Sequence, residues 1–424
     1  MLHVGASRYT SAMRIVHAAD LHLDSPLRGL GRLDDAPVDL LRLATRRAFD
    51  RLVETCLERE AVLLLLAGDV FDGDLKDHHG GVHFARGLER LGRIGCRVCI
   101  VFGNHDAETS VARSMVLPSN VMVFGADAPQ TVRYDELLVC VHGQSYPRRD
   151  VSDNLAKDFP PPVAGLVNFG LLHTNATGST AHARYAPCTV AELVAVGYDY
   201  WALGHVHSRE VLHEDPWVVY SGNLQGRHAR ETGPKGAMVI DVSDGRIEAV
   251  TPIDVDVVRW VSVNVDATDA ADQDAVFDRV EAAFADARTG AGDRPLVARV
   301  TIEGATAAHA SLTAHPDRTE DAVRARAGAA GDVWTEKVVL ATAAPGADVP
   351  HELAGFRAEL ERELTALAED KELVDAYRAD LAVLARTKAG RHLDVAPDAA
   401  VRIAERLSAA RRILLARLLG QEAT

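Results

Sequence analysis

Short apolar runs that end abruptly in polar residues constrain the fold of this chain more than any other feature. The run at 61–67 is apolar throughout, which is typical of a strand covered on both faces of a sheet. Similar runs occur at 14–19 and 97–102, and stretches with helical periodicity at 37–58 and 78–93 lie between the three runs. Strand and helix therefore alternate, which predicts an α/β domain.

The remaining sequence divides the 424 residues into further regions. The α/β domain is expected to span 14–254, because strand-like segments continue along this stretch. Residues 255–341 alternate strand-like and helical segments, which predicts a small α+β accessory domain, with 303–331 expected to be partly loop. Amphipathic periodicity predicts a helical region at 351–424, and residues 1–13 are expected to be a disordered N-terminal extension.

The composition limits the possible classes of protein. A formal net charge of −15 argues against a broad basic face that holds nucleic acid. It does not exclude a nucleic-acid enzyme, since a metal site and a few local Arg or Lys residues can hold phosphate. The 5 cysteines are scattered and form no disulfide framework. No apolar run is long enough to span a membrane and no secretory signal is present, so we expect a cytoplasmic protein.

Polar residues of the types that bind metals follow the apolar runs. Because the carboxyl ends of strands form the ligand crevice of open α/β sheets, these residues are expected to converge. They offer more ligands than one ion needs, which favours two neighbouring divalent ions. Imidazole with carboxylate suits Mn²⁺, Fe²⁺ or Zn²⁺ better than Mg²⁺ or Ca²⁺, and Mn²⁺ is our first choice. The residues are Asp20 and His22 in AADLHLD, Asp69 in LLLLAGDVFD, Asn104 and His105 in CIVFGNHD, His173 in NFGLLHTN, and His205 and His207 in WALGHVHS.

Each of these segments alone has an ordinary explanation. Gly-Asp and Gly-Asn pairs are common in turns, and a single histidine such as His173 is usually satisfied within a core. Asp106 either orients His105 or its loop, or only stabilises the turn. Chance would have to place all the segments at strand ends, so the complete set favours a functional site.

The ordered motifs DLH, GDVFD, GNHD, a single histidine and GHVH resemble the calcineurin-like metallophosphoesterase superfamily. Within it, DLHLDSP, LHTN at 172–175 and SGNLQGRHARETGPKG at 221–236 resemble DNA repair exonucleases of the SbcD and YhaO type. The resemblance implies a layered α/β sandwich of two sheets flanked by helices. A small α+β domain and a helical C-terminal region would follow this core.

The resemblance also implies a role for each matching residue. His105 corresponds to a catalytic histidine that is not a metal ligand, and Asp106 is the next residue of the same catalytic motif. The remaining matches are metal ligands: Asp20, His22 and His207 for one ion, Asn104, His173 and His205 for the second, and Asp69 as the bridging carboxylate.

These roles imply a two-metal-dependent DNA exonuclease, a phosphodiesterase of DNA repair. A hydroxide bridging the metals would attack in line, while His105 would donate a proton or stabilise charge. Two alternatives stay open, a phosphoesterase acting on a small phosphate ester or nucleotide, and a non-enzymatic scaffold. The regions after residue 255 favour the nuclease, and the complete ligand set disfavours the scaffold.

The resemblance implies DNA and an SMC-like coiled-coil ATPase of the SbcC/YhaN type as partners, and leaves a homodimer open. The amphipathic faces in 351–424 either dock on that ATPase or pack on their own chain. Basic residues that follow the last motif either contact nucleic-acid phosphates or belong to a solvated loop. They are Arg227, His228, Arg230 and Lys235.

Overall fold

The structure is a computed structural model that describes residues 12–25, 27, 38–72, 79–108, 115–176 and 186–345. The expected helical region at 351–424 and nearly all of the expected N-terminal extension lie outside these ranges. The chain forms two compact units, and both large sheets belong to the first. The first unit is Met1–Val265, Phe277–Thr301 and Glu320–Val339, and the second is Asp266–Val276, Ile302–Thr319 and Leu340–Thr424.

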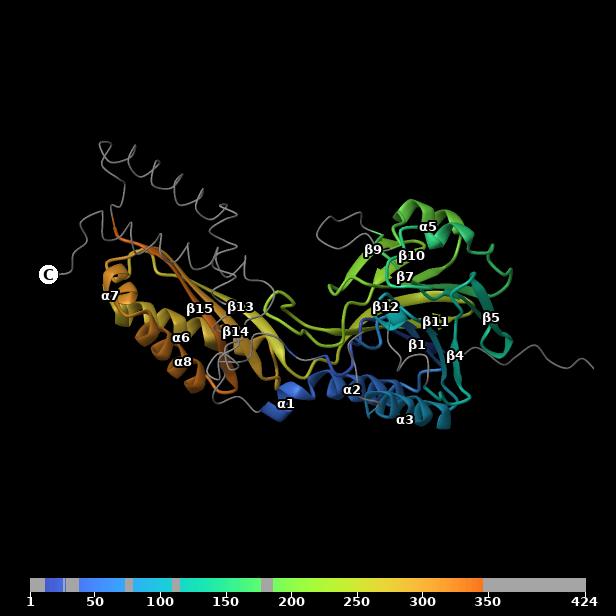
Figure 1. The fold of residues 1–424 in the computed structure, drawn as a ribbon, viewed down its shortest axis with the longest axis horizontal. Helices are drawn as coiled ribbons and strands as arrows, with labels where there is room; N and C mark the ends of the chain where they lie inside the picture. Colours follow the sequence, from blue (N-terminus) through green and yellow to red (C-terminus); the bar gives the residue numbers. More distant parts are fainter. Residues whose placement is uncertain are drawn as a thin grey trace, which may run out of the picture. The chain divides into compact units, whose positions relative to one another are not determined.

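A six-stranded sheet forms one layer of the α/β domain (Figure 1). Its order is β12 (Arg246–Asp254), β11 (Gly236–Ser243), β1 (Met13–Ala18), β2 (Leu63–Ala67), β3 (Arg97–Val101) and β4 (Val121–Val123). The strands β1 to β4 run parallel, whereas β11 and β12 are antiparallel to their neighbours. The carboxyl ends of β1, β2 and β3 therefore lie along one edge.

A second six-stranded sheet forms the other layer. Its order is β5 (Gln130–Tyr134), β6 (Val139–Gln144), β7 (Val167–His173), β8 (Tyr200–Gly204), β10 (Trp217–Tyr220) and β9 (Glu210–Glu214). The central strands β6, β7, β8 and β10 are parallel, and β5 and β9 are antiparallel edges. β7 and β8 thus also end side by side.

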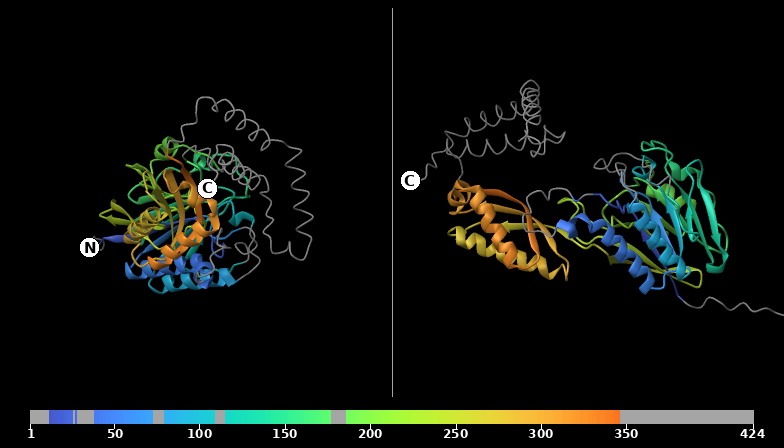
Figure 2. Two further views of the ribbon diagram at one scale, coloured as in Figure 1. Left: turned by 90° about the vertical axis from the view of Figure 1, so that its left-hand side faces the viewer. Right: turned by 60° about the horizontal axis from the view of Figure 1, so that its bottom comes forward.

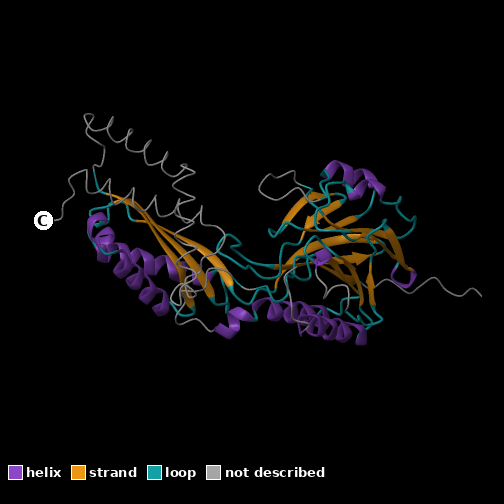
Figure 3. Cartoon of the chain, viewed as in Figure 1, coloured by secondary structure: helices purple, strands orange, loops and turns teal. Residues whose placement is uncertain are grey.

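Alternating side chains build one apolar core on each side of the first sheet. Val16 and Leu64 pack under the helices with Phe49, while Ile15 and Leu65 pack between the two sheets. Figure 3 shows the strands of this domain between helices. These helices are α2 (Ala44–Glu58) and α3 (His79–Arg93) on the first sheet and α5 (Val190–Val196) on the second, whereas Leu41 of α1 (Val38–Arg42) packs with Trp260 and Val297. The predicted sandwich of two sheets flanked by helices is confirmed.

The strands that the sequence did not indicate lie at sheet edges. β5, β9 and β12 each border a sheet, and their side chains are mostly exposed or half-buried. A strand that is covered on one face only, or on neither, needs no continuous apolar run, so it leaves a weak signal in the sequence.

A smaller three-stranded sheet follows the sandwich, in the order β13 (Arg259–Asp266), β14 (Leu296–Ala305) and β15 (Val333–Ala343). Helices α6 (Gln273–Thr289) and α8 (Pro316–Ala329) lie side by side on one of its faces (Figure 2), where Arg326 stacks over Phe277. Much of 303–331, expected to be partly loop, is helical in α7 (His309–Ala314) and α8. The segment forms helices because it is rich in alanine, the strongest helix former, although it has few large apolar residues to mark a buried face.

Candidate metal centre

The carboxyl ends of strands from both sheets meet at one site. Backbone hydrogen bonds join the turns after β1 and β2, where the N–H of Asp20 donates to the Gly68 carbonyl at 3.0 Å and that of His22 to the Asp69 carbonyl at 3.0 Å. In the second sheet the N–H of Thr174 donates to the Gly204 carbonyl at 3.2 Å. The turns that carry the candidate ligands are therefore fixed to one another.

Glycines allow these turns to approach closely. A Cβ on Gly204 would lie 1.9 Å from the Ala67 carbonyl oxygen, and one on Gly103 would lie 2.3 Å from Asp69 Oδ1. The glycine before each Asp, Asn or His in GD, GN and GH thus makes room for the centre. No other residue type fits without moving the neighbouring strand end.

Several candidate ligands adopt left-handed backbone conformations that non-glycine residues rarely adopt. The φ angles are 51° for Asp20, 42° for His22, 51° for Asp69 and 102° for His205. Strained backbone of this kind persists only where surrounding contacts hold it, and it concentrates at functional sites. Its clustering at the strand ends supports a functional centre here.

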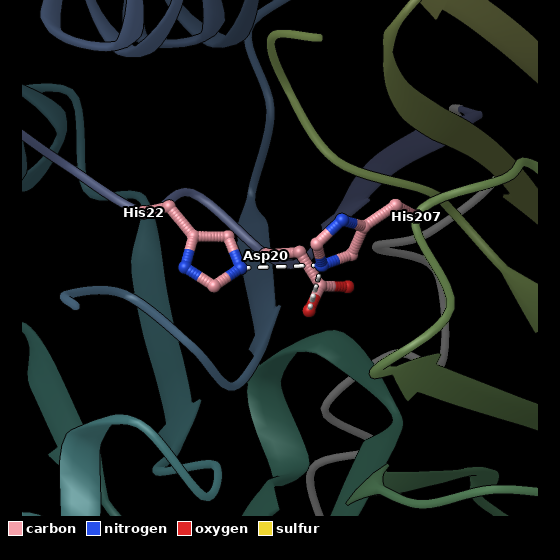
Figure 4. Close-up of side chains that lie close together, drawn as sticks. All are labelled: Asp20, His22 and His207. Carbon is pink, nitrogen blue, oxygen red and sulfur yellow. Dashed lines mark hydrogen bonds and ion pairs between the residues drawn. The ribbon is translucent and has the colours of Figure 1, made fainter. Parts of the chain in front are cut away.

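Asp20, His22 and His207 form the first group of ligand atoms, all within 4.8 Å of one another (Figure 4). The Nδ1 of His22 lies 2.7 Å from an oxygen of Asp72, and the Nδ1 of His207 lies 2.6 Å from an oxygen of Glu231. Carboxylates accept hydrogen bonds, so each neutral ring carries its proton on Nδ1 and a lone pair on Nε2.

These lone pairs face other electron-rich atoms. The two Nε2 atoms of His22 and His207 are 3.2 Å apart, and Asp20 Oδ1 lies 3.7 Å from the Nε2 of His207. Acceptors that face one another in a buried site are stabilised by a proton or a metal ion between them. The first group therefore fits a metal ion.

The pKa values of the two histidines are shifted in opposite directions. Burial lowers the pKa of His22 and favours its neutral form. Burial also acts to lower the pKa of His207, but the hydrogen bond to Glu231 and the charge of Asp20 outweigh it, so the net pKa is raised. Asp20 and Glu231 thus favour a positive charge at His207.

Asp69 and His173 form a second group together with Asp20, again within 4.8 Å. The Nδ1 of His173 donates to the Ala67 carbonyl at 2.9 Å. Its Nε2 lies 3.0 Å from Asn104 Oδ1 and 3.5 Å from Asp69 Oδ2. The imidazole of His205 packs against the ring of His173 with centroids 5.3 Å apart.

Asp69 lies between His22 of the first group and His173 of the second. Its Oδ2 is 3.9 Å from the Nε2 of His22 and 3.5 Å from the Nε2 of His173, and its Oδ1 accepts the backbone N–H of His105 at 3.0 Å. Burial acts to raise the pKa of Asp69, but His173, His22 and His105 outweigh it and lower the pKa. An ionised carboxylate in this place can contact ions on both sides.

His105 and Asp106 follow in the turn and the 3-10 helix (Asp106–Glu108). The His105 side chain is 34% exposed, and its Nδ1 lies 3.4 Å from Asp72 Oδ1. Asp106 is buried and accepts backbone N–H groups of Gly103, Val70 and Phe71, which ties the GNHD turn to the GDVF turn. Burial, with Asp69 nearby, raises the pKa of Asp106 to about 8. These contacts of Asp106 fit a residue that holds the loop of His105 in position.

Two carboxylates of the centre were not predicted from the sequence. Asp72 ends the GDVFD motif, and Glu231 lies in RHARETG. Despite burial, the pKa of each carboxyl is lowered, chiefly by the histidine that it holds. A histidine that binds a metal usually donates its other N–H to a carboxylate or carbonyl, so partners of this kind were to be expected, but the rule does not identify which carboxylates they are.

The basic residues expected near DNA differ in their surroundings. Arg227 lies 3.3 Å from Asp72 Oδ2, and buried Lys235, 6% exposed, donates its Nζ to the His207 carbonyl at 2.7 Å. His228 is half-buried beside Glu231, and Arg230 is exposed. Their contact with nucleic acid stays a prediction. Among the described residues, no helix is long and apolar enough to cross a membrane.

Comparison with known proteins agrees with this geometry. The family model for calcineurin-like phosphoesterases matches residues 13–209, and that for the middle domain of the metallophosphoesterase YhaO matches residues 260–343. The uncharacterized metallophosphoesterase YhaO of Bacillus subtilis is 33% identical over 296 residues, which cover 69% of this chain and 72% of that protein. The chain therefore belongs to the calcineurin-like metallophosphoesterases, and its middle region is that of the YhaO group.

More distant relatives carry names that refer to DNA repair or to a nuclease. The DNA double-strand break repair protein Mre11 of Methanopyrus kandleri is 25% identical, over 59% of each chain. The SbcD component of the nuclease SbcCD of Escherichia coli is 23% identical, over 59% of this chain and 70% of that one.

Proposed function

We propose that this metallophosphoesterase is a two-metal-dependent DNA exonuclease that hydrolyses phosphodiester bonds in DNA repair. The observation that most supports two metals is the position of Asp69 between His22 of the first group and His173 of the second. Such an arrangement suits two divalent ions that share one carboxylate.

The proposed ligand assignment is the one that the sequence resemblance implies. Asp20, His22 and His207 would hold one ion, Asn104, His173 and His205 the other, and Asp69 would bridge them. Mn²⁺ is the expected metal, because the ligands combine imidazole, carboxylate and amide oxygen, with Fe²⁺ or Zn²⁺ as the alternatives. When bound, the ions would lower the pKa of water and neutralise the phosphodiester.

The chain's own residues would orient the substrate and move a proton. The His105 side chain is partly exposed, and its Nδ1 lies 3.4 Å from Asp72 Oδ1. Its Nε2 is then the atom that would donate a proton to the leaving oxygen or stabilise the charge that develops there. Asp106 would keep the turn of His105 in place through its three backbone contacts.

The DNA substrate is proposed from the names of the Mre11 and SbcD relatives. An SMC-like coiled-coil ATPase of the SbcC/YhaN type would be the partner, which would explain how a chain of net charge −15 acts on DNA. A homodimer stays open. Arg227, His228, Arg230 and Lys235 are the expected phosphate contacts.

A nuclease assay tests the proposal against its alternatives. Purified protein, stripped of metal and reloaded with Mn²⁺, is incubated with linear duplex and single-stranded DNA labelled at either end. Release of labelled nucleotides supports the nuclease. Cleavage of small phosphate esters or model diesters alone would make it a small-molecule phosphoesterase, and failure to bind metal would leave only the scaffold.

A further inference from the structure

A third group of possible ligands adjoins the proposed centre. His22, Asp72 and His105 place one ligand atom each within 4.8 Å of one another. Asp72 Oδ1 is 2.7 Å from the Nδ1 of His22 and 3.4 Å from the Nδ1 of His105. This group uses the opposite nitrogen of His22 from the one that faces His207 and Asp20.

A metal ion in this third group would harm the proposed reaction. It would displace the proton on the Nδ1 of His22, and that proton is what fixes the lone pair of Nε2 toward the first group. It would also bind His105, the residue expected to donate a proton. A centre with so many histidines and carboxylates therefore needs a device that keeps a further cation out.

Arg227 has the position and charge for this task. Its Nη1 lies 3.3 Å from Asp72 Oδ2 and donates to Ser25 Oγ at 3.2 Å. Its Nη2 lies 3.8 Å from Glu231 Oε1, and its backbone N–H donates to Glu231 Oε2 at 2.7 Å. The guanidinium is thus held between the two carboxylates that support His22 and His207.

We propose that Arg227 is a positioning residue that acts as a fixed cation: by pairing with Asp72 it excludes a third metal ion and keeps His105 free of metal. A divalent ion on Asp72 would lie one carboxylate away from the guanidinium, where like charges repel strongly. Arginine suits this role because it stays charged and its planar fork reaches two carboxylates at once. The inference rests on the proposed two-metal function.

The test is the number of Mn²⁺ ions bound by the full-length protein, measured by equilibrium dialysis and elemental mass spectrometry over a range of Mn²⁺ concentrations. Wild type is expected to bind about two. Arg227→Gln is expected to bind about one more, at a concentration about tenfold or more below that at which wild type takes up any further ion. Damage to the fold lowers the number bound, so an increase separates this role from a structural one.

Further variants locate the additional ion. Arg227→Lys keeps the charge and is expected to bind about two ions, as wild type does. Adding Asp72→Asn to Arg227→Gln should remove the additional ion. Arg299→Gln, which breaks a bidentate pair with Glu336 at 2.9 Å in the small sheet, is the matched control and should leave the number unchanged.

Other outcomes overturn the inference. If Arg227→Gln binds fewer ions than wild type, Arg227 supports the first metal position. If it binds the same number and only KM for DNA rises, Arg227 contacts substrate phosphate. Both results leave the two-metal function intact, whereas a wild-type protein that binds no Mn²⁺ removes that function itself.

Discussion

Buried histidines occur in two regions of this molecule, and their surroundings are opposite. In the core around the second sheet, the Nδ1 of His17 lies 3.0 Å from the Tyr200 hydroxyl and its Nε2 lies 3.2 Å from the Leu203 carbonyl. His142 similarly has a Thr131 hydroxyl at 2.9 Å and the Asn168 Oδ1 at 3.1 Å. Each ring therefore has a hydroxyl that can donate and an oxygen that can accept.

At the metal centre the same residue type meets only acceptors beyond its Nδ1 proton. The Nε2 atoms of His22 and His207 face each other, and that of His173 faces Asn104 Oδ1 and Asp69 Oδ2. An unsatisfied buried acceptor costs about 1–3 kcal/mol. A buried histidine with one donor and one acceptor as partners is thus structural. A buried histidine whose Nε2 faces only acceptors is a candidate ligand for a cation. This difference leads to the predictions below.

The largest effect on activity is expected at His105, which lies at the centre but is not one of the proposed metal ligands. His105→Ala should lower kcat by about 10²–10⁴-fold, the usual contribution of a positioned general acid. The amount of bound Mn²⁺ should stay at the wild-type value, as measured by mass spectrometry. A variant that loses its metal together with its activity would place His105 among the ligands instead.

The structural histidine should show its effect in folding. His17→Leu leaves the Tyr200 hydroxyl and the Leu203 carbonyl without their partner, which is expected to lower the free energy of unfolding by about 3 kcal/mol. Urea denaturation in the presence of a chelator measures this change. Asn104→Leu is the matched variant at the centre, and there we expect a change below about 1 kcal/mol, because it removes one of the facing acceptors. Equal losses in the two variants would contradict the distinction between the regions.

The stabilisation by added metal should differ between the two variants. At a free Mn²⁺ concentration of about 100 times Kd, wild type is expected to gain about 2.7 kcal/mol in the free energy of unfolding. His17→Leu should gain as much, since its centre is intact, while Asn104→Leu should gain less. Thermal and urea denaturation with and without Mn²⁺ provide the measurement, and an undiminished gain in Asn104→Leu would argue against Asn104 as a ligand.

The sequence predicted those parts of the fold and centre that local patterns determine. Runs such as β2 mark central strands, and Gly followed by Asp, Asn or His marks their ends, so the candidate ligands were found. Asp72 and Glu231 were missed because their pairing with His22 and His207 joins residues 50 and 24 positions apart. His17 and His22 lie in one short segment, and only the contacts with Tyr200 and His207 distinguish the structural histidine from the candidate ligand.

The last prediction concerns the pH dependence of stability and isolates His17. Burial lowers the pKa of His17 from 6.5 to about 3 in the folded protein. Between these two values only the unfolded chain binds the proton, so this histidine's contribution to stability is complete above pH 6.5 and declines as the pH falls toward 3. The decline is about 1.4 kcal/mol per pH unit.

His17→Gln cannot take up this proton, and the difference in unfolding free energy between wild type and variant should therefore shrink with that slope on acidification in chelator. Other titrating groups are common to both proteins and cancel in the difference. Parallel pH profiles of the two proteins would show that His17 takes up its proton as readily in the folded as in the unfolded state. His17 would then no longer be a neutral structural histidine with which the histidines of the centre can be compared.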